Sequence, residues 1–116
     1  MGYEKFSKQR RASKDQAMIT ILKGGQLSIN KVCVEKYLKK YKYVVMYFDL
    51  EQRKVGMQPT NDATNDAYNI RFIKDGKLAN ISVKLFLKHF GIKHEKSVAY
   101  SATWNDKEKL VEITLK

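Results

Sequence analysis

The sequence contains very little cysteine and no long hydrophobic run. Its single cysteine, Cys33, excludes an intrachain disulfide and is typical of a protein from a reducing compartment. No apolar stretch approaches the roughly 18 residues that a membrane-spanning helix needs. The first residues are polar and charged, unlike those of a signal peptide. We therefore expect a cytoplasmic protein that does not associate with a membrane.

Sequence motifs of the familiar enzyme classes are also missing. The chain has no Walker loop, no Gly-x-Ser-x-Gly motif and no recognisable Ser/His/Asp spacing. His89 and His94 with one cysteine do not complete a zinc site without carboxylates from elsewhere. Cys33 lies near an expected helix N-terminus, which could lower its pKa, but a free cysteine is more often a small buried residue. We expect a protein that is not an enzyme and holds no metal or cofactor.

Acidic residues are scarce relative to basic ones. Twenty-three lysines and arginines against twelve aspartates and glutamates give a formal net charge of +11. A charge of this size attracts polyanions, of which nucleic acid is the commonest, although a lysine-rich surface can also serve solubility alone. With 116 residues and 43% hydrophobic composition, the chain is long enough for one globular domain with one core.

A pattern of two strands and a helix begins at residue 18. In the runs Ile19–Ile21 and Leu27–Ile29, apolar and polar residues alternate as in half-buried strands. Gly24 and Gly25 between them permit the positive φ of a tight turn. Asn30 is a good N-cap for the helix that follows. The apolar face of this helix is expected to carry Val34, Tyr37, Leu38 and Tyr41. Two more strands are expected at 43–48 and 55–58, the second stopped by Pro59.

The same order of elements recurs in the second half. Strands at 70–73 and 78–81 flank Asp75-Gly76, which is a strong hairpin signal, and Ser82 is the expected N-cap of a second helix. The apolar face of that helix is expected to carry Val83, Phe86, Leu87 and Phe90, with Gly91 at its end. Strands at 97–103 and 110–115 complete the second unit.

These patterns predict an α+β, strand-rich fold made of two strand-strand-helix-strand-strand repeats. The repeats, 18–59 and 68–116, are expected to share one core as an internal pseudo-dimer with two short helices. Residues 60–67 repeat Thr-Asn-Asp-Ala and do not match the EF-hand spacing, so we interpret them as a linker. Residues 1–17 form a basic N-terminal arm.

The first unit resembles the AbrB/SpoVT/MraZ class of swapped-hairpin DNA-binding proteins. The resemblance lies in Lys23–Asn30 with a helix ending near Leu38, and a second copy is suggested by Leu78–Ser82 with Phe90–Ile92. MraZ-type proteins also carry two copies. Two departures are that the arginine usual after the turn glycine is Gln26 or Lys77, and that the proline usual at the helix start is Asn30 or Ser82.

The resemblance implies a non-catalytic DNA-binding protein, either a transcriptional regulator or a nucleoid-type protein. Members of this class dock basic strand and turn residues against DNA, as dimers or as paired repeats, so a homodimer is left open. The matching positions are Lys23, Gln26, Lys31, Lys74, Lys77 and Lys84, and Arg71 is added subject to its strand register. Charge alone adds Arg10, Arg11 and Lys14 from the arm. We expect DNA rather than RNA as the partner, bound through one basic face.

Two alternatives stay open at this point. A strand-rich protein can bind single-stranded nucleic acid by stacking bases on exposed aromatic rings. The candidate rings are Tyr47, Tyr68, Phe72, Tyr100 and Trp104, and Trp104 is favoured because it lies beside the turn at Asn105–Asp106. The other alternative is a protein-interaction module whose charge serves an acidic partner.

Overall fold

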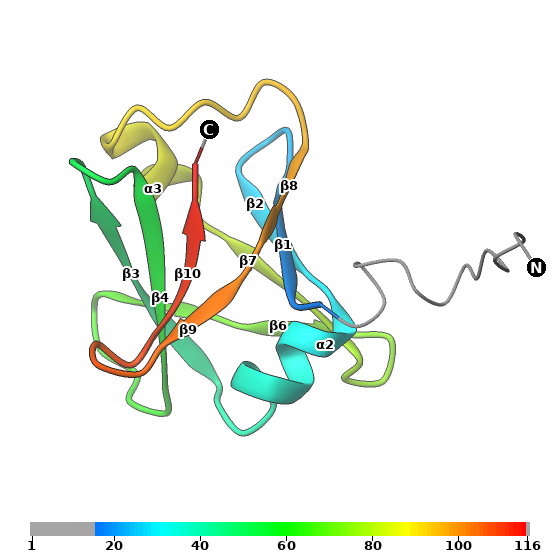
Figure 1. Ribbon diagram of the computed structural model, residues 1–116. Helices are drawn as coiled ribbons and strands as arrows, with labels where there is room; N and C mark the ends of the chain where they lie inside the picture. Colours follow the sequence, from blue (N-terminus) through cyan, green and yellow to red (C-terminus); the bar gives the residue numbers. More distant parts are fainter. Residues whose placement is uncertain (1–15, 116) are drawn as a thin grey trace, which may run out of the picture.

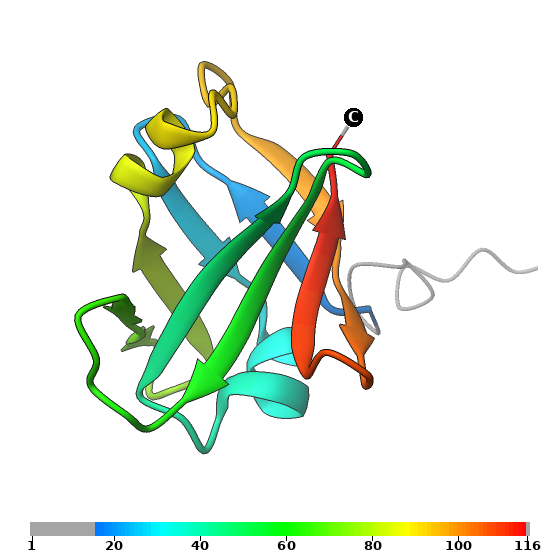
Figure 2. The same ribbon diagram turned by 90° about the vertical axis from the view of Figure 1, so that its left-hand side faces the viewer.

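A computed structural model, which describes residues 16–115, contains two five-stranded antiparallel sheets around one core (Figures 1 and 2). Sheet A consists, in spatial order, of β6 (Arg71–Ile73), β7 (Leu78–Ser82), β2 (Gln26–Ile29), β1 (Met18–Ile21) and β8 (Val98–Ser101). Sheet B consists of β5 (Ala67–Asn69), β3 (Tyr43–Asp49), β4 (Lys54–Thr60), β10 (Leu110–Thr114) and β9 (Thr103–Asn105).

The two sheets are joined at both edges and form a barrel. The edge strands β5 and β6 are separated only by Ile70, and β8 and β9 only by Ala102. The Ala102 N–H donates to the carbonyl oxygen of Ala17 at 2.8 Å, and the Ile70 N–H donates to that of Lys42 at 2.9 Å. Each bent strand therefore leaves one sheet and enters the other with its backbone groups paired. Closure of this kind removes exposed sheet edges.

The strand order confirms the predicted repeat. The series β1, β2, helix, β3, β4 corresponds to β6, β7, helix, β8–β9, β10. β2 pairs with β7 inside sheet A, and β4 pairs with β10 inside sheet B, so each repeat contributes to both sheets. Each of these two pairs joins corresponding strands of the two units antiparallel to each other, so we infer an approximate two-fold axis between β2 and β7 and between β4 and β10. The two units thus form one internal pseudo-dimer rather than two separate bodies.

Both predicted helices are present and short. Helix α2 (Lys31–Cys33) continues without a break into one wider π-helical segment, η2 (Val34–Leu38). The predicted N-cap is confirmed, because the Asn30 side chain accepts a hydrogen bond from the Cys33 N–H at 3.0 Å. Helix α3 (Lys84–His89) belongs to the second repeat and lies at the opposite end of the barrel from α2 (Figure 1).

The predicted N-cap at Ser82 is wrong. Ser82 is the last residue of β7, where it pairs with Gln26, and Val83 occupies the N-cap position without a side-chain hydrogen bond. The Val83 N–H instead donates to the carbonyl oxygen of Gly25 at 3.0 Å. This hydrogen bond to the first hairpin takes the place of a side-chain N-cap for α3, and Ser82 stays in β7.

Two strand boundaries also differ from the expectation. β4 continues through Pro59 to Thr60 because it stays paired with β3, with Pro59 opposite Val44, whereas its pairing with β10 ends at Met57. The single strand expected at 97–103 is two strands that bend at Ala102. Tyr41 lies after the helix and is 37% exposed, so it is not part of the buried helical face.

The core is entirely apolar in the part of the chain that the structure describes. Alternate strand residues such as Ile19, Ile29, Ile81 and Val111 point inward and are at most 2% exposed. No polar or charged residue of 16–115 is classed with them as buried. All polar chemistry of these residues is consequently at or near the surface.

Candidate nucleic-acid interface

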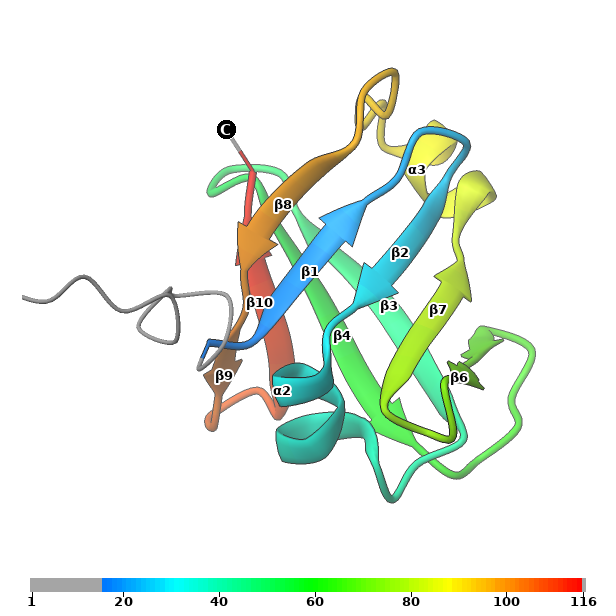
Figure 3. The same cartoon turned by 90° about the vertical axis from the view of Figure 1, so that its right-hand side faces the viewer.

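The outer face of sheet A is a row of small polar side chains. The strand register aligns Arg71 with Asn80, Asn80 with Ser28, and Ser28 with Thr20. These positions alternate with the buried ones, so all four side chains point away from the core. Figure 3 views this face directly, with β8, β1, β2 and β7 in front and no helix crossing them. The face is therefore accessible along several strands.

Beside the middle of this row, two residues further along β2 and β7, Gln26 and Ser82 pair with each other, and both are exposed. Together with Ser28 and Asn80 they give the central two strands four uncharged outward groups that can donate and accept hydrogen bonds, and Leu78 at the start of β7 is an apolar residue on the same side. Side chains of this kind form directional contacts with base edges or with phosphate oxygens.

The first hairpin turn and the start of α3 meet at one end of sheet A. The carbonyl oxygen of Gly25 accepts from the Val83 N–H, and a Cβ on Gly25 would lie 2.9 Å from the Cβ of Lys84. The φ angle of Gly25 is +93°. Only glycine permits both this backbone angle and this close approach. The contact brings Lys23 of the turn and Lys84 of the helix to the same end.

The second hairpin turn and the start of α2 lie at the other end. Because β2 and β7 are antiparallel, the end of β2 that leads into Lys31 is beside the start of β7, which follows the turn with Lys74 and Lys77. In that turn Lys74, Asp75 and Gly76 all have positive φ, between 56° and 81°. Lys31 is 3.9 Å from Glu35 in an exposed ion pair.

The approximate two-fold axis relates these two ends. Each end combines a lysine in the hairpin turn of one repeat with a lysine at the helix start of the other repeat. Within residues 16–115, ion pairs engage Lys31, Lys54 and Lys109, and none engages Lys23, Lys74, Lys77, Lys84 or Arg71. Their charges are available to an anionic ligand.

The predicted lysines of the described chain, with Gln26 and Arg71, lie on or beside this surface in an arrangement that differs from the expected one. We expected one basic face, whereas the structure places the lysines in two groups separated by uncharged strands. Arg71 is exposed and pairs with Asn80 across β6 and β7, and this register places its side chain on the outer face of sheet A. Thr20, Ser28 and Asn80 were missed, although strand alternation was the signal that could have identified them. Arg10, Arg11 and Lys14 lie outside the described residues.

The aromatic candidates separate into two kinds. Tyr68, Phe72 and Tyr100 pack against the core. Tyr47 is 47% exposed on sheet B and Trp104 is 38% exposed at the α2 end. Trp104 stacks on Tyr37 of η2, and it is not part of the sheet A face.

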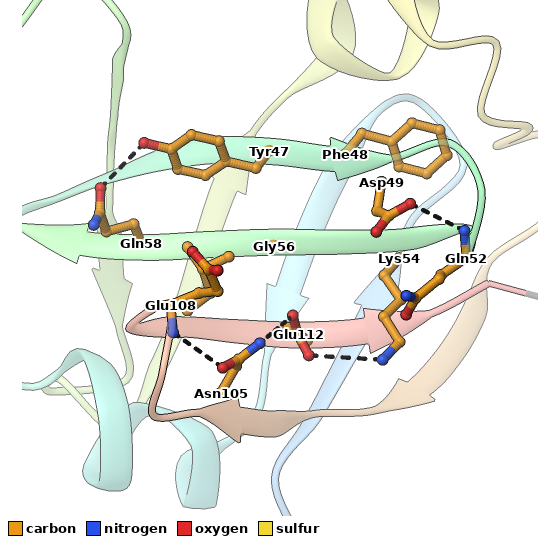
Figure 4. Close-up of a pocket in the computed structure, with 11 residues that line it drawn as sticks. Tyr47, Phe48, Asp49, Gln52, Lys54, Gly56, Gln58, Asn105, Glu108 and Glu112 are labelled. Atoms are coloured by element: carbon orange, nitrogen blue, oxygen red, sulfur yellow. Dashed lines mark hydrogen bonds and ion pairs between the residues drawn. The ribbon is translucent and has the colours of Figure 1, made fainter.

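The outer face of sheet B has a hollow of about 480 Å³ (Figure 4). Its floor includes Gly56, with Tyr47 on one side and Glu112 on the other. The Tyr47 hydroxyl donates to Gln58 at 3.2 Å, and the Asn105 amide donates to Glu112 at 3.0 Å. These polar groups bind one another, and the hollow presents no pairing of a nucleophile with a base.

The described residues contain no second cluster of reactive or metal-binding side chains. Burial raises the pKa of the Cys33 thiol to about 12, which makes it a weak nucleophile. Residues 16–115 contain no group of three or more His, Cys, Asp or Glu side chains placed to hold a metal ion. None of the helices in this range is long and apolar enough to cross a membrane.

Comparison with models of known protein families, with curated proteins and with solved structures finds no match to this chain. The resemblance to swapped-hairpin DNA-binding proteins accordingly stays a hypothesis.

Proposed function

We propose that this protein is a non-catalytic DNA-binding protein, a transcriptional regulator or nucleoid-type protein, that contacts duplex DNA with the outer face of sheet A. The observation that supports the proposal is the repetition of a lysine-bearing end on both sides of an uncovered strip of polar side chains. A duplex has its own two-fold symmetry, and binding proteins commonly match it with theirs.

The dimensions of the strip suit a DNA groove. β2 has four residues, which at about 3.3 Å each span roughly 13 Å, close to the major-groove width of about 12 Å. The lysines at both ends contact phosphates on either side of the groove, while Gln26 and Asn80 reach toward base edges. The major groove of A-form RNA is too deep and narrow for such a ribbon, so the proposal favours DNA. Arg10, Arg11 and Lys14 add phosphate contacts.

Salt-dependent binding to duplex DNA tests this proposal. Each lost phosphate contact reduces the slope of log K against log salt by about 0.9. A Lys23→Ala, Lys84→Ala variant therefore loses about two units of slope, and Lys74→Ala, Lys77→Ala loses a similar amount. The matched control, Arg53→Ala with Lys54→Ala, removes the same charge from the β3–β4 turn of sheet B and keeps the slope. Equal losses in all three variants would contradict a specific face, and no duplex binding would favour a protein-interaction module.

A further inference from the structure

We propose that the stacked pair of Tyr37 and Trp104 is a second nucleic-acid site, which binds an unpaired base of a single strand. The site lies where η2 meets β9, at the α2 end of the barrel (Figures 1 and 3). It lies apart from the outer face of sheet A, so it does not depend on duplex binding there.

The two rings form a preorganised stack. Their centroids are 5.5 Å apart and their planes differ by 10°. Tyr37 is partly buried against the core, whereas Trp104 is 38% exposed. The part of Trp104 that is exposed therefore belongs to a ring whose position Tyr37 helps to hold. An exposed aromatic ring in a fixed position suits stacking with a nucleobase.

Hydrogen bonds fix the orientation of the indole. The Trp104 indole N–H donates to the Asp106 carboxylate at 3.3 Å, and the Lys109 ammonium donates to the same oxygen at 3.0 Å. The Lys109 hydrogen bond, followed by that from Trp104, lowers the pKa of Asp106. Asp106 is thus ionised and able to accept both bonds at neutral pH.

Several lysines lie close to Tyr37 in the chain. Lys36, Lys39 and Lys40 are within three residues of Tyr37 and are exposed. No ion pair within residues 16–115 engages these three lysines, and the nearby Glu35 is already paired with Lys31. Lys107 follows Trp104 in the β9–β10 turn and is also exposed. This positive border can hold the phosphates of a strand whose base rests on the indole.

Stacking on the indole requires a ligand with an uncovered ring face. Bases inside a duplex are covered above and below by their neighbours, so only an unpaired base offers a free ring face. Stacking of a base on an aromatic side chain contributes about 1–3 kcal/mol by alanine substitution and tolerates any base. The expected ligand is consequently single-stranded DNA or RNA without strong sequence preference.

Fluorescence provides a direct test, because Trp104 is the only tryptophan in the chain. Titrating the full protein with a short oligodeoxythymidine should quench its emission. Trp104→Ala should weaken binding of the fluorescein-labelled oligonucleotide about 5- to 150-fold, measured by anisotropy. Trp104→Phe should keep the fold and recover part of the affinity, and Lys36→Ala with Lys40→Ala should reduce the salt slope.

The controls separate this site from the sheet A face. Tyr47→Ala, which removes an exposed ring from sheet B, should leave oligonucleotide binding unchanged, and Trp104→Ala should leave duplex affinity within about twofold. Absence of quenching, or wild-type oligonucleotide affinity in Trp104→Ala, would overturn the proposal and leave the stack as a packing contact. Failure of duplex binding alone would reject the sheet A proposal and not this one.

Discussion

Asn30 connects three segments at the start of the first repeat. Its side-chain oxygen accepts from the backbone N–H groups of Met18 and Cys33, both at 3.0 Å, and its amide donates to the carbonyl oxygen of Gln16 at 2.9 Å. The cap therefore holds the beginning of β1 as well as the beginning of α2. Helix capping alone contributes about 1 kcal/mol, and the strand contacts add to it.

The same cap brings Cys33 into the core, where it is fully buried. A thiol with the ordinary pKa of 9.0 is half ionised at pH 9, whereas one with a pKa of about 12 is ionised in roughly one molecule per thousand. We predict that native protein resists iodoacetamide at pH 9 and reacts fully in urea, as measured by mass spectrometry.

The sign of the linked pH effect follows from the same shift. Because the folded state holds the thiol proton more tightly, this contribution to stability is constant below about pH 9 and decreases between pH 9 and about 12. Equal alkylation rates in the native and urea-treated protein would contradict the burial of this side chain.

At the level of elements, local patterns predicted most strands and both helices. The alternation around Leu27–Ile29 and the turn glycines determine the hairpins within a few residues of sequence. The errors at Ser82 and Pro59 arose from contacts that no local pattern contains. One is the hydrogen bond from Val83 to the distant Gly25, and the other is the end of the β10 ladder at Met57.

The candidate site was predictable to a similar extent. The resemblance to swapped-hairpin DNA-binding proteins nominated Lys23 and Lys84 by their positions in the first turn and at the start of the second helix. Their proximity depends on the pairing of β2 with β7, which joins residues at least 50 positions apart. The outward side of Arg71 likewise follows only from its register with Asn80. The resemblance and the charge pattern therefore nominated candidate residues, but only the strand pairing shows which of them share a surface.

The close contact at the first hairpin turn gives a matched pair of glycine substitutions. Gly24 and Gly25 both have positive φ, 106° and 93°, so an alanine is strained at either position. A Cβ on Gly24 meets nothing within 4 Å, whereas one on Gly25 would lie 3.0 Å from the Cα of Lys84.

We predict that Gly25→Ala lowers the free energy of unfolding by about 1–3 kcal/mol more than Gly24→Ala, because it adds overpacking to the shared backbone strain. Urea denaturation of the two variants measures the difference. Equal stabilities would mean that the turn and α3 are not in close contact.

The whole molecule depends on pairing between its two halves. Of the eight strand ladders, β1–β2, β3–β4, β6–β7 and β9–β10 lie within a repeat, and β1–β8, β2–β7, β3–β5 and β4–β10 join the repeats. Each half thus exposes apolar inner faces and unpaired strand edges when the other is removed. Within the chain, the second repeat supplies the partner that another subunit would otherwise have to provide.

A fragment of residues 16–62 tests this dependence. It retains β1 to β4 but lacks every strand that pairs with them across the approximate two-fold axis. We expect no folded monomer: the fragment should be unfolded at low concentration and should gain strand structure only as a dimer, in which a second copy takes the place of β7 and β10. Circular dichroism together with sedimentation equilibrium across a concentration series measures both properties. A folded monomeric fragment would show that the first repeat has a core of its own. Folding would then not require the pairing between the two repeats that also brings the two lysine-bearing ends into their symmetric positions.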